Sequence, residues 1–269
     1  MSAKLFPDLD RATYDNLPGM RKSILWHGNK SMADLALAMT HKFEATPEMD
    51  TGSAVHTLVL EPDKFGDEFA VAMKVDGRTA EGKAYKEKFA AECNGRTVLN
   101  SEQMKTAMAM ADRLRSCEML TKMLAKDGGL VEAAVQWTDE ETGVLCKGRM
   151  DWCLPTFTPP IIIDLKTTSS AHPRKFAKSI GDFGYHVQAA MYSDAIEQIT
   201  GQAPVFLFYC VESCPPFKVR SFYLSDRALY LGRIKYRDLL SQYQRCVDTG
   251  EWPGYPEEPE EIDLPAWAD

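Results

Sequence analysis

The stretch that decides the fold runs from Gly148 to Lys166 and reads GRMDWCLPTFTPPIIIDLK. Its three consecutive isoleucines, Ile161–Ile163, are β-branched and predict a central strand that continues through Asp164-Leu165-Lys166. Residues two apart in a strand point to the same face, about 6.6 Å apart, so Asp164 and Lys166 should emerge side by side. If the strand that carries Asp151 pairs with this one, a second carboxylate joins them.

Two carboxylates and a lysine at one strand edge suit the Mg²⁺-dependent hydrolysis of a phosphodiester. Asp151 and Asp164 would hold the hard cation through oxygen, and the cation would polarise the phosphate and lower the pKa of a bound water. Lys166 would position that water or stabilise the developing negative charge. The alternative is an ordinary salt bridge at a strand end. It is weakened because Asp164 directly follows a run that should be buried, where an ionised group needs a partner or a metal.

The segments on either side predict a mixed α/β fold. Two strands, Val131–Trp137 and Val144–Cys153, should be joined by the turn Asp139–Gly143, and two more follow at Val205–Val211 and Phe217–Leu224. Helices are expected at about Ser23–His41, Gly52–Leu60, Thr79–Glu92, Ser101–Leu124 (with Ser101 as N-cap), Gly184–Thr200 and Asp226–Thr249. This order indicates a single domain over residues 1–269, with a mainly helical part (1–130), a core of β-meander and helices (131–250) and an acidic, proline-rich tail (251–269).

Composition excludes several classes of protein. The 269 residues are 45% apolar, but no run approaches the 18 apolar residues of a membrane-spanning helix. The N-terminus lacks the pattern of a secretory signal and the seven cysteines show no close pairing, so a cytoplasmic protein with reduced thiols and no membrane partner is expected. The net charge of −8 does not exclude DNA, because the tail holds seven acidic residues and the other 32 nearly balance the 31 basic ones.

Four further side chains are candidates for the same site. His56 would be a metal ligand if its helix approaches Asp151 and Asp164, and is otherwise a hydrogen-bonded core histidine. Gln188 and Tyr192 are spaced i, i+4 on one helix face, where they either contact substrate or pack in the core. Glu132 is either a further ligand for metal or water, or an exposed strand carboxylate.

Taken together, these motifs resemble the RecE-type exonucleases (exodeoxyribonuclease VIII) of the PD-(D/E)xK superfamily, whose core is a central mixed β-sheet flanked by helices. The resemblance covers most of the chain. It rests on these blocks: Tyr14 to Ser23 with Leu25; Gly52-x-Ala54-x-His56 with Leu60-Glu61-Pro62; Asp76-x-Arg78-Thr79 with Glu81-Gly82-Lys83; Glu132; Thr142-Gly143; Gly148-Arg149-Met150-Asp151-Trp152; Asp164-Leu165-Lys166-Thr167-Thr168; Tyr185-x-x-Gln188-Ala189-Ala190-x-Tyr192; and Trp252-Pro253-Gly254-Tyr255 with Leu264-Pro265-x-Trp267.

The resemblance implies a role for each matched position. The metal ligands would be His56, Asp151, Asp164 and the backbone carbonyl of Leu165, with Glu132 as a further candidate. Lys166 would be the catalytic lysine, supported by Gln188 and Tyr192, which match the Gln-x-x-x-Tyr motif of related nucleases. DNA contacts are expected at Arg149, Thr167, Thr168, Arg78 and Lys83, while each basic residue has the alternative of a solvated surface charge.

The resemblance also implies an activity and its partners. The enzyme would digest double-stranded DNA from its ends in the 5′→3′ direction with Mg²⁺, or Mn²⁺ as a substitute, and without ATP. It would leave 3′ single-stranded tails for a strand-annealing recombinase, in DNA recombination and repair of a phage or prophage. A homo-oligomeric ring that encloses the DNA, with a tetramer favoured, is similarly implied.

Three rival interpretations remain open. One is a structure-specific or sequence-specific endonuclease of the same fold. Another is a relative that carries an iron–sulfur cluster, which is not expected because the sequence contains no Cys-x-x-Cys. The third is a non-catalytic DNA-end-binding protein, which the presence of Asp151, Asp164 and Lys166 argues against.

Overall fold

The computed structural model describes residues 3–41 and 44–264 and centres on one seven-stranded mixed sheet. Its strands are β1 (Lys4–Phe6), β2 (Met20–Arg21), β5 (Leu130–Thr138), β6 (Leu145–Leu154), β7 (Ile161–Thr168), β8 (Val205–Glu212) and β9 (Val219–Tyr223). Their spatial order is β1-β5-β6-β7-β8-β9, with β2 paired to β6 off this path. The pairs β7–β8 and β2–β6 are parallel and the others antiparallel.

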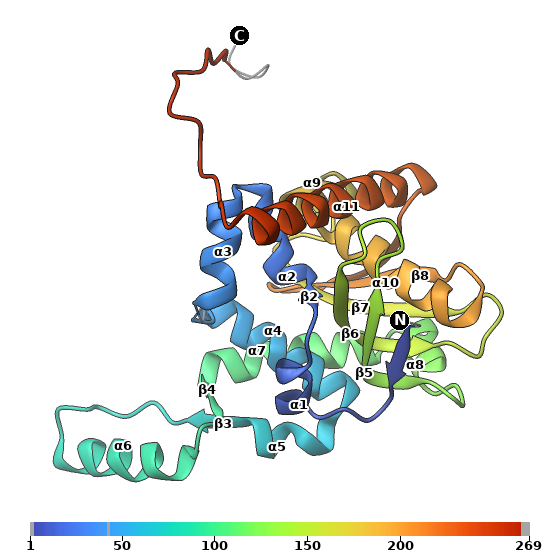
Figure 1. Cartoon of the computed structure of the whole chain (residues 1–269). Helices are drawn as coiled ribbons and strands as arrows, with labels where there is room; N and C mark the ends of the chain where they lie inside the picture. The colour runs from blue at the N-terminus through green and yellow to red at the C-terminus, as the bar shows by residue number, and fades with distance from the viewer. Residues whose placement is uncertain (1–2, 42–43, 265–269) are drawn as a thin grey trace.

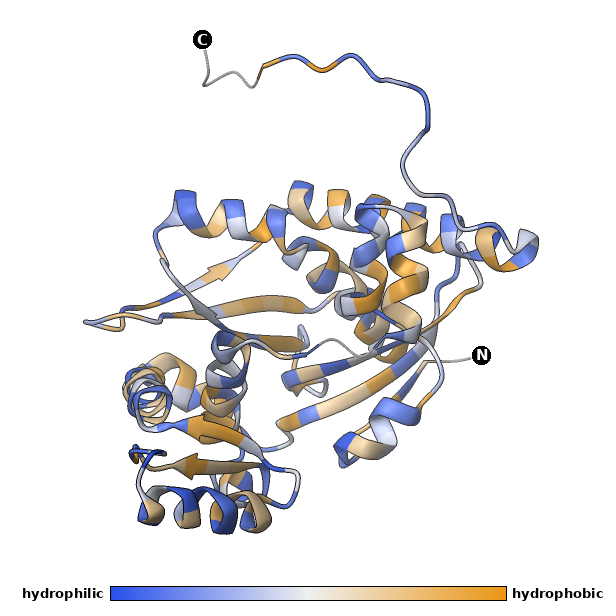
Figure 2. Ribbon diagram, turned by 90° about the vertical axis from the view of Figure 1, so that its left-hand side faces the viewer, coloured by the Kyte–Doolittle hydropathy of each residue, from blue (hydrophilic) through white to orange (hydrophobic). Residues whose placement is uncertain are grey.

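Helices cover both faces of this sheet, so it separates two hydrophobic cores (Figure 1). One core lies under α2 (Lys22–Leu25), α3 (Met32–Thr40), α9 (Pro173–Asp182), α10 (Tyr185–Thr200) and α11 (Asp226–Thr249). The other lies under α4 (Pro47–Leu60), α7 (Ser101–Arg115) and α8 (Glu118–Leu124). Figure 2 shows the apolar residues concentrated on the strands and on parts of the helices. The predicted fold class, a central mixed sheet flanked by helices, is confirmed.

The alternation of β7 assigns its side chains to the two cores. Ile161, Ile163 and Leu165 pack into the core under α4 and α7, whereas Ile162 packs into the core under α10. By the same alternation Asp164 and Lys166 belong to the α10 face. The polar end of β7 is therefore directed at one helix, α10, which is where the sequence places Gln188 and Tyr192.

The alternation of β5 and β6 slips at one position. Cys146 and Met150 of β6 face the α10 core, but Trp152, two residues further on, packs into the core under α4 and α7. The residue between them is Asp151, and on β5 the facing residue Glu132 has a positive φ of 51°. A non-glycine residue in this left-handed region is strained and occurs often at functional sites. Because of this slip, Asp151 and Glu132 do not follow the regular alternation of side chains between the two faces of the sheet.

The N-terminal segment is fastened to the sheet by a buried lysine. Lys147 of β6 donates hydrogen bonds to the carbonyls of Tyr14 and Asp15, both at 3.0 Å, and of Leu17 at 2.6 Å. These carbonyls lie at the end of α1 (Arg11–Asn16), where a cation complements the helix dipole. The contact holds α1 beside β6 and sets the start of β2.

The helix predicted over Ser23–His41 is broken in the structure. It consists of α2, a 3-10 turn η1 (Trp26–Asn29) and α3, which begins anew with Ser31 as N-cap. The helix predicted over Ser101–Leu124 is likewise two helices, α7 and α8. Its N-cap is Asn100 rather than Ser101, because Asn100 accepts the backbone N–H groups of residues 102 and 103 in a capping box.

Two short strands form a separate sheet beside α7. These are β3 (Phe69–Ala72), which follows η2 (Pro62–Lys64) and α5 (Phe65–Glu68), and β4 (Thr97–Asn100). They are parallel and are linked by α6 (Ala80–Cys93), which projects away from the body of the molecule (Figure 1). We call residues 73–96 the α6 arm.

The C-terminal tail is anchored near its start and then leaves the body. Trp252 packs on Tyr243 with ring centroids 6.1 Å apart, and the carbonyl of Pro253 accepts the N–H of Ala33 at 3.0 Å. Beyond this point the tail extends away from the helices (Figure 1), and Tyr255, a matched position of the resemblance, is 73% exposed. Trp267, another matched position, lies outside the described residues. Among the described residues, no helix has the length and apolar character that crossing a bilayer requires.

Candidate active site

The two aspartates predicted to converge lie where β6 and β7 part. Pairing of these strands ends at Trp152 and Ile163. Beyond this pair, Oδ2 of Asp151 accepts a hydrogen bond from the backbone N–H of Leu165 at 2.7 Å. A side chain of β6 therefore replaces the backbone carbonyl that would otherwise accept this bond. The N–H and C=O of an extended residue point to the same side. The Leu165 carbonyl therefore opens toward the same gap as the Asp151 carboxylate.

Asp164 and Lys166 form a buried ion pair on the α10 side of this gap. Gln188 donates a hydrogen bond to Oδ1 of Asp164, and the Lys166 ammonium contacts Oδ2. Burial raises the pKa of Asp164, although Lys166 opposes this shift. Burial disfavours the Lys166 ammonium, but attraction by Asp164 and Asp151 outweighs it and raises the pKa of Lys166. Lys166 is therefore a charged group at neutral pH.

Three side chains from three different elements converge on the other side of the gap. His56 of α4, Glu132 of β5 and Asp151 of β6 each offer a ligand atom, and these atoms all lie within 4.8 Å of one another. Nδ1 of His56 is 3.4 Å from Oδ2 of Asp151. Burial lowers the pKa of His56, but Asp151 raises it more, to about 9. The metal-ligand interpretation of His56 required α4 to approach Asp151, and it does.

This group of donors fits a divalent cation. Burial and repulsion by Asp151 raise the pKa of Glu132 to about 7, which shows that two carboxylates approach each other without enough positive charge between them. In addition, Oδ2 of Asp164 is buried and, within the described part of the chain, accepts no well-aligned hydrogen bond. Oxygen ligands and one imidazole suit Mg²⁺ or Mn²⁺. A cation would be held by His56, Glu132 and Asp151, with the Asp164 carboxylate and the Leu165 carbonyl beside them.

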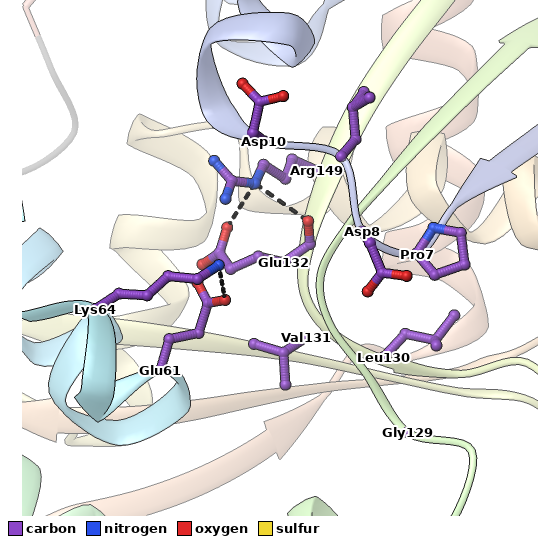
Figure 3. A pocket seen from close by; sticks show the side chains of 11 residues that line it. Pro7, Asp8, Asp10, Glu61, Lys64, Gly129, Leu130, Val131, Glu132 and Arg149 are labelled. Carbon is purple, nitrogen blue, oxygen red and sulfur yellow. Dashed lines mark hydrogen bonds and ion pairs between the residues drawn. The ribbon is translucent and has the colours of Figure 1, made fainter. Parts of the chain in front are cut away.

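Arg149 holds Glu132 in its strained conformation. Nε of Arg149 lies 2.9 Å from Oε2 of Glu132 and donates to the Glu132 carbonyl at 3.1 Å. The two residues line a cavity of about 270 Å³ that opens beside the metal-ligand group (Figure 3). Its walls are mostly charged, since they also include Asp8, Asp10, Glu61 and Lys64. The position of Arg149 puts a guanidinium next to the candidate metal ligands.

Helix α10 forms the wall behind Lys166. The Nζ atom of Lys166 lies 4.9 Å from the centroid of the Tyr185 ring. Tyr192 is buried, and its ring lies against Gly148, where an added Cβ would come within 2.4 Å of a ring carbon. Gln188 thus contacts Asp164 directly, whereas Tyr192 acts at a distance by packing α10 onto β6. The core-packing alternative describes Tyr192 better than it describes Gln188.

The predicted DNA-binding residues fall into two groups. Arg149, Thr167 and Thr168 lie at the site: Oγ1 of Thr167 comes close to Gly52 of α4, and the Thr168 hydroxyl hydrogen-bonds the backbone of the following turn. Arg78 and Lys83 lie instead on the α6 arm, and the Arg78 side chain is 92% exposed and paired with Asp76. The structure does not bring these two residues to the metal-ligand group.

Sequence reasoning missed one charged residue at this site, Lys22. Its Nζ lies 5.6 Å from the centroid of the Tyr185 ring, beside Lys166. Lys22 lies within the block Tyr14 to Ser23 on which part of the resemblance rests, but no spacing or periodic signal around the two-residue strand β2 assigned this lysine to the site.

Comparison with known proteins identifies the family and the fold of the chain. The model of a family described as "PDDEXK-like domain of unknown function (DUF3799)" matches residues 21–265. None of the curated proteins matches the chain. A crystal structure of a "Putative exonuclease" from Eubacterium rectale is similar in fold, with a TM-score of 0.61 and 14% identity over 96% of each chain. A second structure, of a protein called SSO0001, covers 80% of this chain and 85% of its own at 14% identity, but its TM-score of 0.29 is too low to show a common fold.

The family match extends over nearly all of the described chain, from β2 to the tail, and includes every residue of the metal-ligand group as well as Asp164 and Lys166. The similar crystal structure shares the arrangement of elements rather than the sequence. The chain therefore belongs to the family of PDDEXK-like domains.

Proposed function

We propose that this protein is a divalent-metal-dependent exonuclease that degrades linear double-stranded DNA from its ends. The observation that carries the proposal is the convergence of His56, Glu132 and Asp151 beside the Asp164–Lys166 ion pair. The family match supplies a nuclease-like fold around these residues, and the Eubacterium rectale structure of similar fold is itself described as an exonuclease.

The residues divide the chemistry between them. A divalent cation bound at the three converging side chains would polarise the scissile phosphate and lower the pKa of the attacking water. Lys166 contributes a charged ammonium next to the cation position, where it stabilises the negative charge that develops on the phosphate oxygens. Gln188 fixes the Asp164 carboxylate by its hydrogen bond, and Asp164 in turn orients Lys166. Arg149 keeps Glu132 turned toward His56 and Asp151.

We further propose 5′→3′ polarity, 3′ single-stranded products for a strand-annealing recombinase, and a homo-oligomeric ring, with a tetramer favoured, that encloses the DNA. The support for these features is the resemblance to RecE-type exonucleases. A ring would make digestion processive, because a threaded duplex slides between nonspecific phosphate contacts without dissociating. Arg78 and Lys83 are exposed on the α6 arm, and we propose that this arm contacts DNA outside the active site.

The test is digestion of linear duplex labelled at its 5′ or 3′ ends, with and without Mg²⁺, beside covalently closed circular DNA. We expect Mg²⁺-dependent release of nucleotides from 5′ ends and no cutting of the circle. Lys166→Ala should abolish release while the fold, measured by circular dichroism, stays intact. Lys122→Ala is the matched control, because that lysine is 73% exposed and pairs with Glu118 on α8. Cutting of the circle would indicate an endonuclease instead, and normal turnover by Lys166→Ala would reject the assigned role.

A further inference from the structure

A second ammonium group lies beside Lys166. Lys22 and Lys166 place their Nζ atoms 5.6 and 4.9 Å from the centroid of the same Tyr185 ring. The two cations are therefore separated by no more than the sum of these distances. Neighbouring phosphates of a nucleic-acid strand can contact both ammonium groups over such a span.

The position of Lys22 is fixed by contacts with the turn between α9 and α10. Its Nζ donates to the carbonyl of Phe183 at 2.5 Å, and Nε1 of Trp26 donates to the carbonyl of Asp182 at 3.2 Å. The Trp26 ring also meets His186 edge-on, with centroids 6.0 Å apart. The Lys22 side chain is thus held near Lys166 rather than free to swing into solvent.

Lys22 has no ion-pair partner of its own among residues 3–41 and 44–264, whereas Lys166 is paired with Asp164. Burial and repulsion by Lys166 lower the pKa of Lys22 to about 7, and attraction by Asp164 offsets only part of this shift. A half-buried cation beside another cation is unfavourable unless an anion joins them. The arrangement therefore favours binding of an anion.

The alternative is that Lys22 has a structural role at the end of α9. Phe183 is the C-cap residue of that helix, and a cation there complements the helix dipole. However, an ammonium has three N–H donors, and the bond to Phe183 uses one. A capping role also gives no reason for the ammonium to lie against the ring that already contacts Lys166.

We infer that Lys22 is a phosphate-binding residue, which together with Lys166 holds a phosphate group of the DNA strand next to the one that is cleaved. This inference rests on the proposed function for the identity of the ligand. The group bound is either the terminal 5′ phosphate or an internal phosphodiester, and both present the same anionic oxygens to the two ammonium groups.

The experiment measures binding of a short labelled duplex by the full chain in the presence of a chelator, so that cleavage is not needed. We expect Lys22→Met and Lys22→Gln to weaken binding about tenfold, because a charged hydrogen bond is lost. Lys22→Arg should bind within about threefold of the wild type. The control is Lys30→Met, since Lys30 is 69% exposed and pairs with Asp34 at the start of α3.

Two further measurements separate the alternatives. If Lys22 only caps α9, Lys22→Met lowers the melting temperature and leaves the Kd for DNA unchanged, which overturns the inference. Should Lys22→Met not fold, Lys22→Gln gives the same answer, because glutamine keeps a donor for the Phe183 carbonyl. A loss confined to duplex with a 5′ phosphate assigns the terminal group, and an equal loss without it assigns an internal phosphate. Failure of the wild type to bind duplex at all would count against the proposed function itself.

Discussion

Two groups of buried carboxylates in this molecule differ in how many hydrogen-bond donors and positive charges surround them. The first joins the β5–β6 turn to α10 and α11. Asp139 accepts hydrogen bonds from Thr142, Tyr236 and Arg237, and its pKa is lowered because the bonds from Thr142 and Tyr236 outweigh its burial. Asp194 lies within hydrogen-bond distance of the same Tyr236 hydroxyl, whose single proton goes to one of the two carboxylates at a time, and it is paired with Arg233 and Arg237. Every carboxylate of this group faces donors, as in a structural network.

The second group is the candidate active site, where carboxylates face each other. The pKa of Glu132 is raised to about 7 and that of Asp164 is also raised, in both cases chiefly by burial. Asp139 and Asp164 are each only 1% exposed, but the donors around Asp139 outweigh the effect of burial on its pKa, whereas those around Asp164 do not. Buried carboxylates that lack enough hydrogen-bond donors indicate a binding site for a cation. Buried carboxylates that are surrounded by donors indicate a role in stabilising the fold.

The largest effect is expected from Asp151→Asn. This variant keeps an oxygen for the Leu165 N–H but removes a charge from the metal-ligand group, so cleavage should fall by about 10³-fold or more. Single-turnover digestion of linear duplex measures the loss, and Mn²⁺ titration by calorimetry shows whether metal binding falls with it. Unchanged metal affinity would contradict the assignment of Asp151 as a ligand.

Arg237→Met tests the matched group. It leaves Asp139 and Asp194 with fewer donors, and we expect the free energy of unfolding to fall by about 3 kcal/mol. The measurement is urea denaturation. Cleavage per folded molecule should equal that of the wild type, because within the described part of the chain Arg237 pairs with Asp139, Glu141 and Asp194 and not with residues of the active site. A lower turnover by a fully folded variant would show that the Asp139–Asp194 group also affects catalysis, and would contradict its purely structural role.

Glu132→Gln should change stability in the opposite direction. The carboxyl pKa is raised from 4.5 to about 7, so its ionised form costs stability above pH 7 and costs nothing below about pH 4.5. Glutamine keeps an acceptor for Arg149 without the charge. We expect the metal-free variant to be about 1–3 kcal/mol more stable than the wild type at pH 8, with no gain at pH 4.5, and to bind Mn²⁺ more weakly. Equal stability at pH 8 would argue against repulsion at this site.

The smallest effect is a pH dependence of metal binding. The pKa of His56 is raised to about 9 in the metal-free protein, and only the neutral imidazole can bind a metal. Proton competition at His56 should therefore make the affinity for Mn²⁺ rise about tenfold per pH unit between about pH 7 and pH 9, and more steeply below pH 7, where Glu132 is protonated as well. Calorimetry at several pH values measures the slope. His56→Gln should reduce it, and a wild-type affinity independent of pH would exclude His56 as a ligand.

Much of the fold was predictable from local signals. The β-branched run Ile161–Ile163 marks β7, and Ser225 and Gly250 bound α11 at the residues where its pattern starts and ends. In contrast, β1 and β2 contain three and two residues, and their pairing with β5 and β6 is decided by contacts far along the chain. The ten-residue helix α9 was also missed, because it lies between a strand end and α10 without a separate pattern.

The candidate site divides in the same way. The side-by-side placement of Asp164 and Lys166 follows from the period of a strand, and the structure has them in contact. The approach of His56 needs the packing of α4 against β6, and the approach of Glu132 needs a left-handed residue within a strand. Neither can be inferred from spacing, and the block Tyr14 to Ser23, although part of the resemblance, has no periodic signal that would assign Lys22 to the site. The roles of all these residues stay predictions.

The pairing of Met20 with Cys146 has a consequence for how the protein is made. On the ribosome, β2 emerges long before β6, and closing so large a loop requires that both strands have left the exit tunnel. The two lysines that contact Tyr185 and the ligands from α4, β5 and β6 can therefore meet only late in synthesis. A nascent chain would therefore lack nuclease activity while it is being made, and would gain this activity only after β2 has paired with β6.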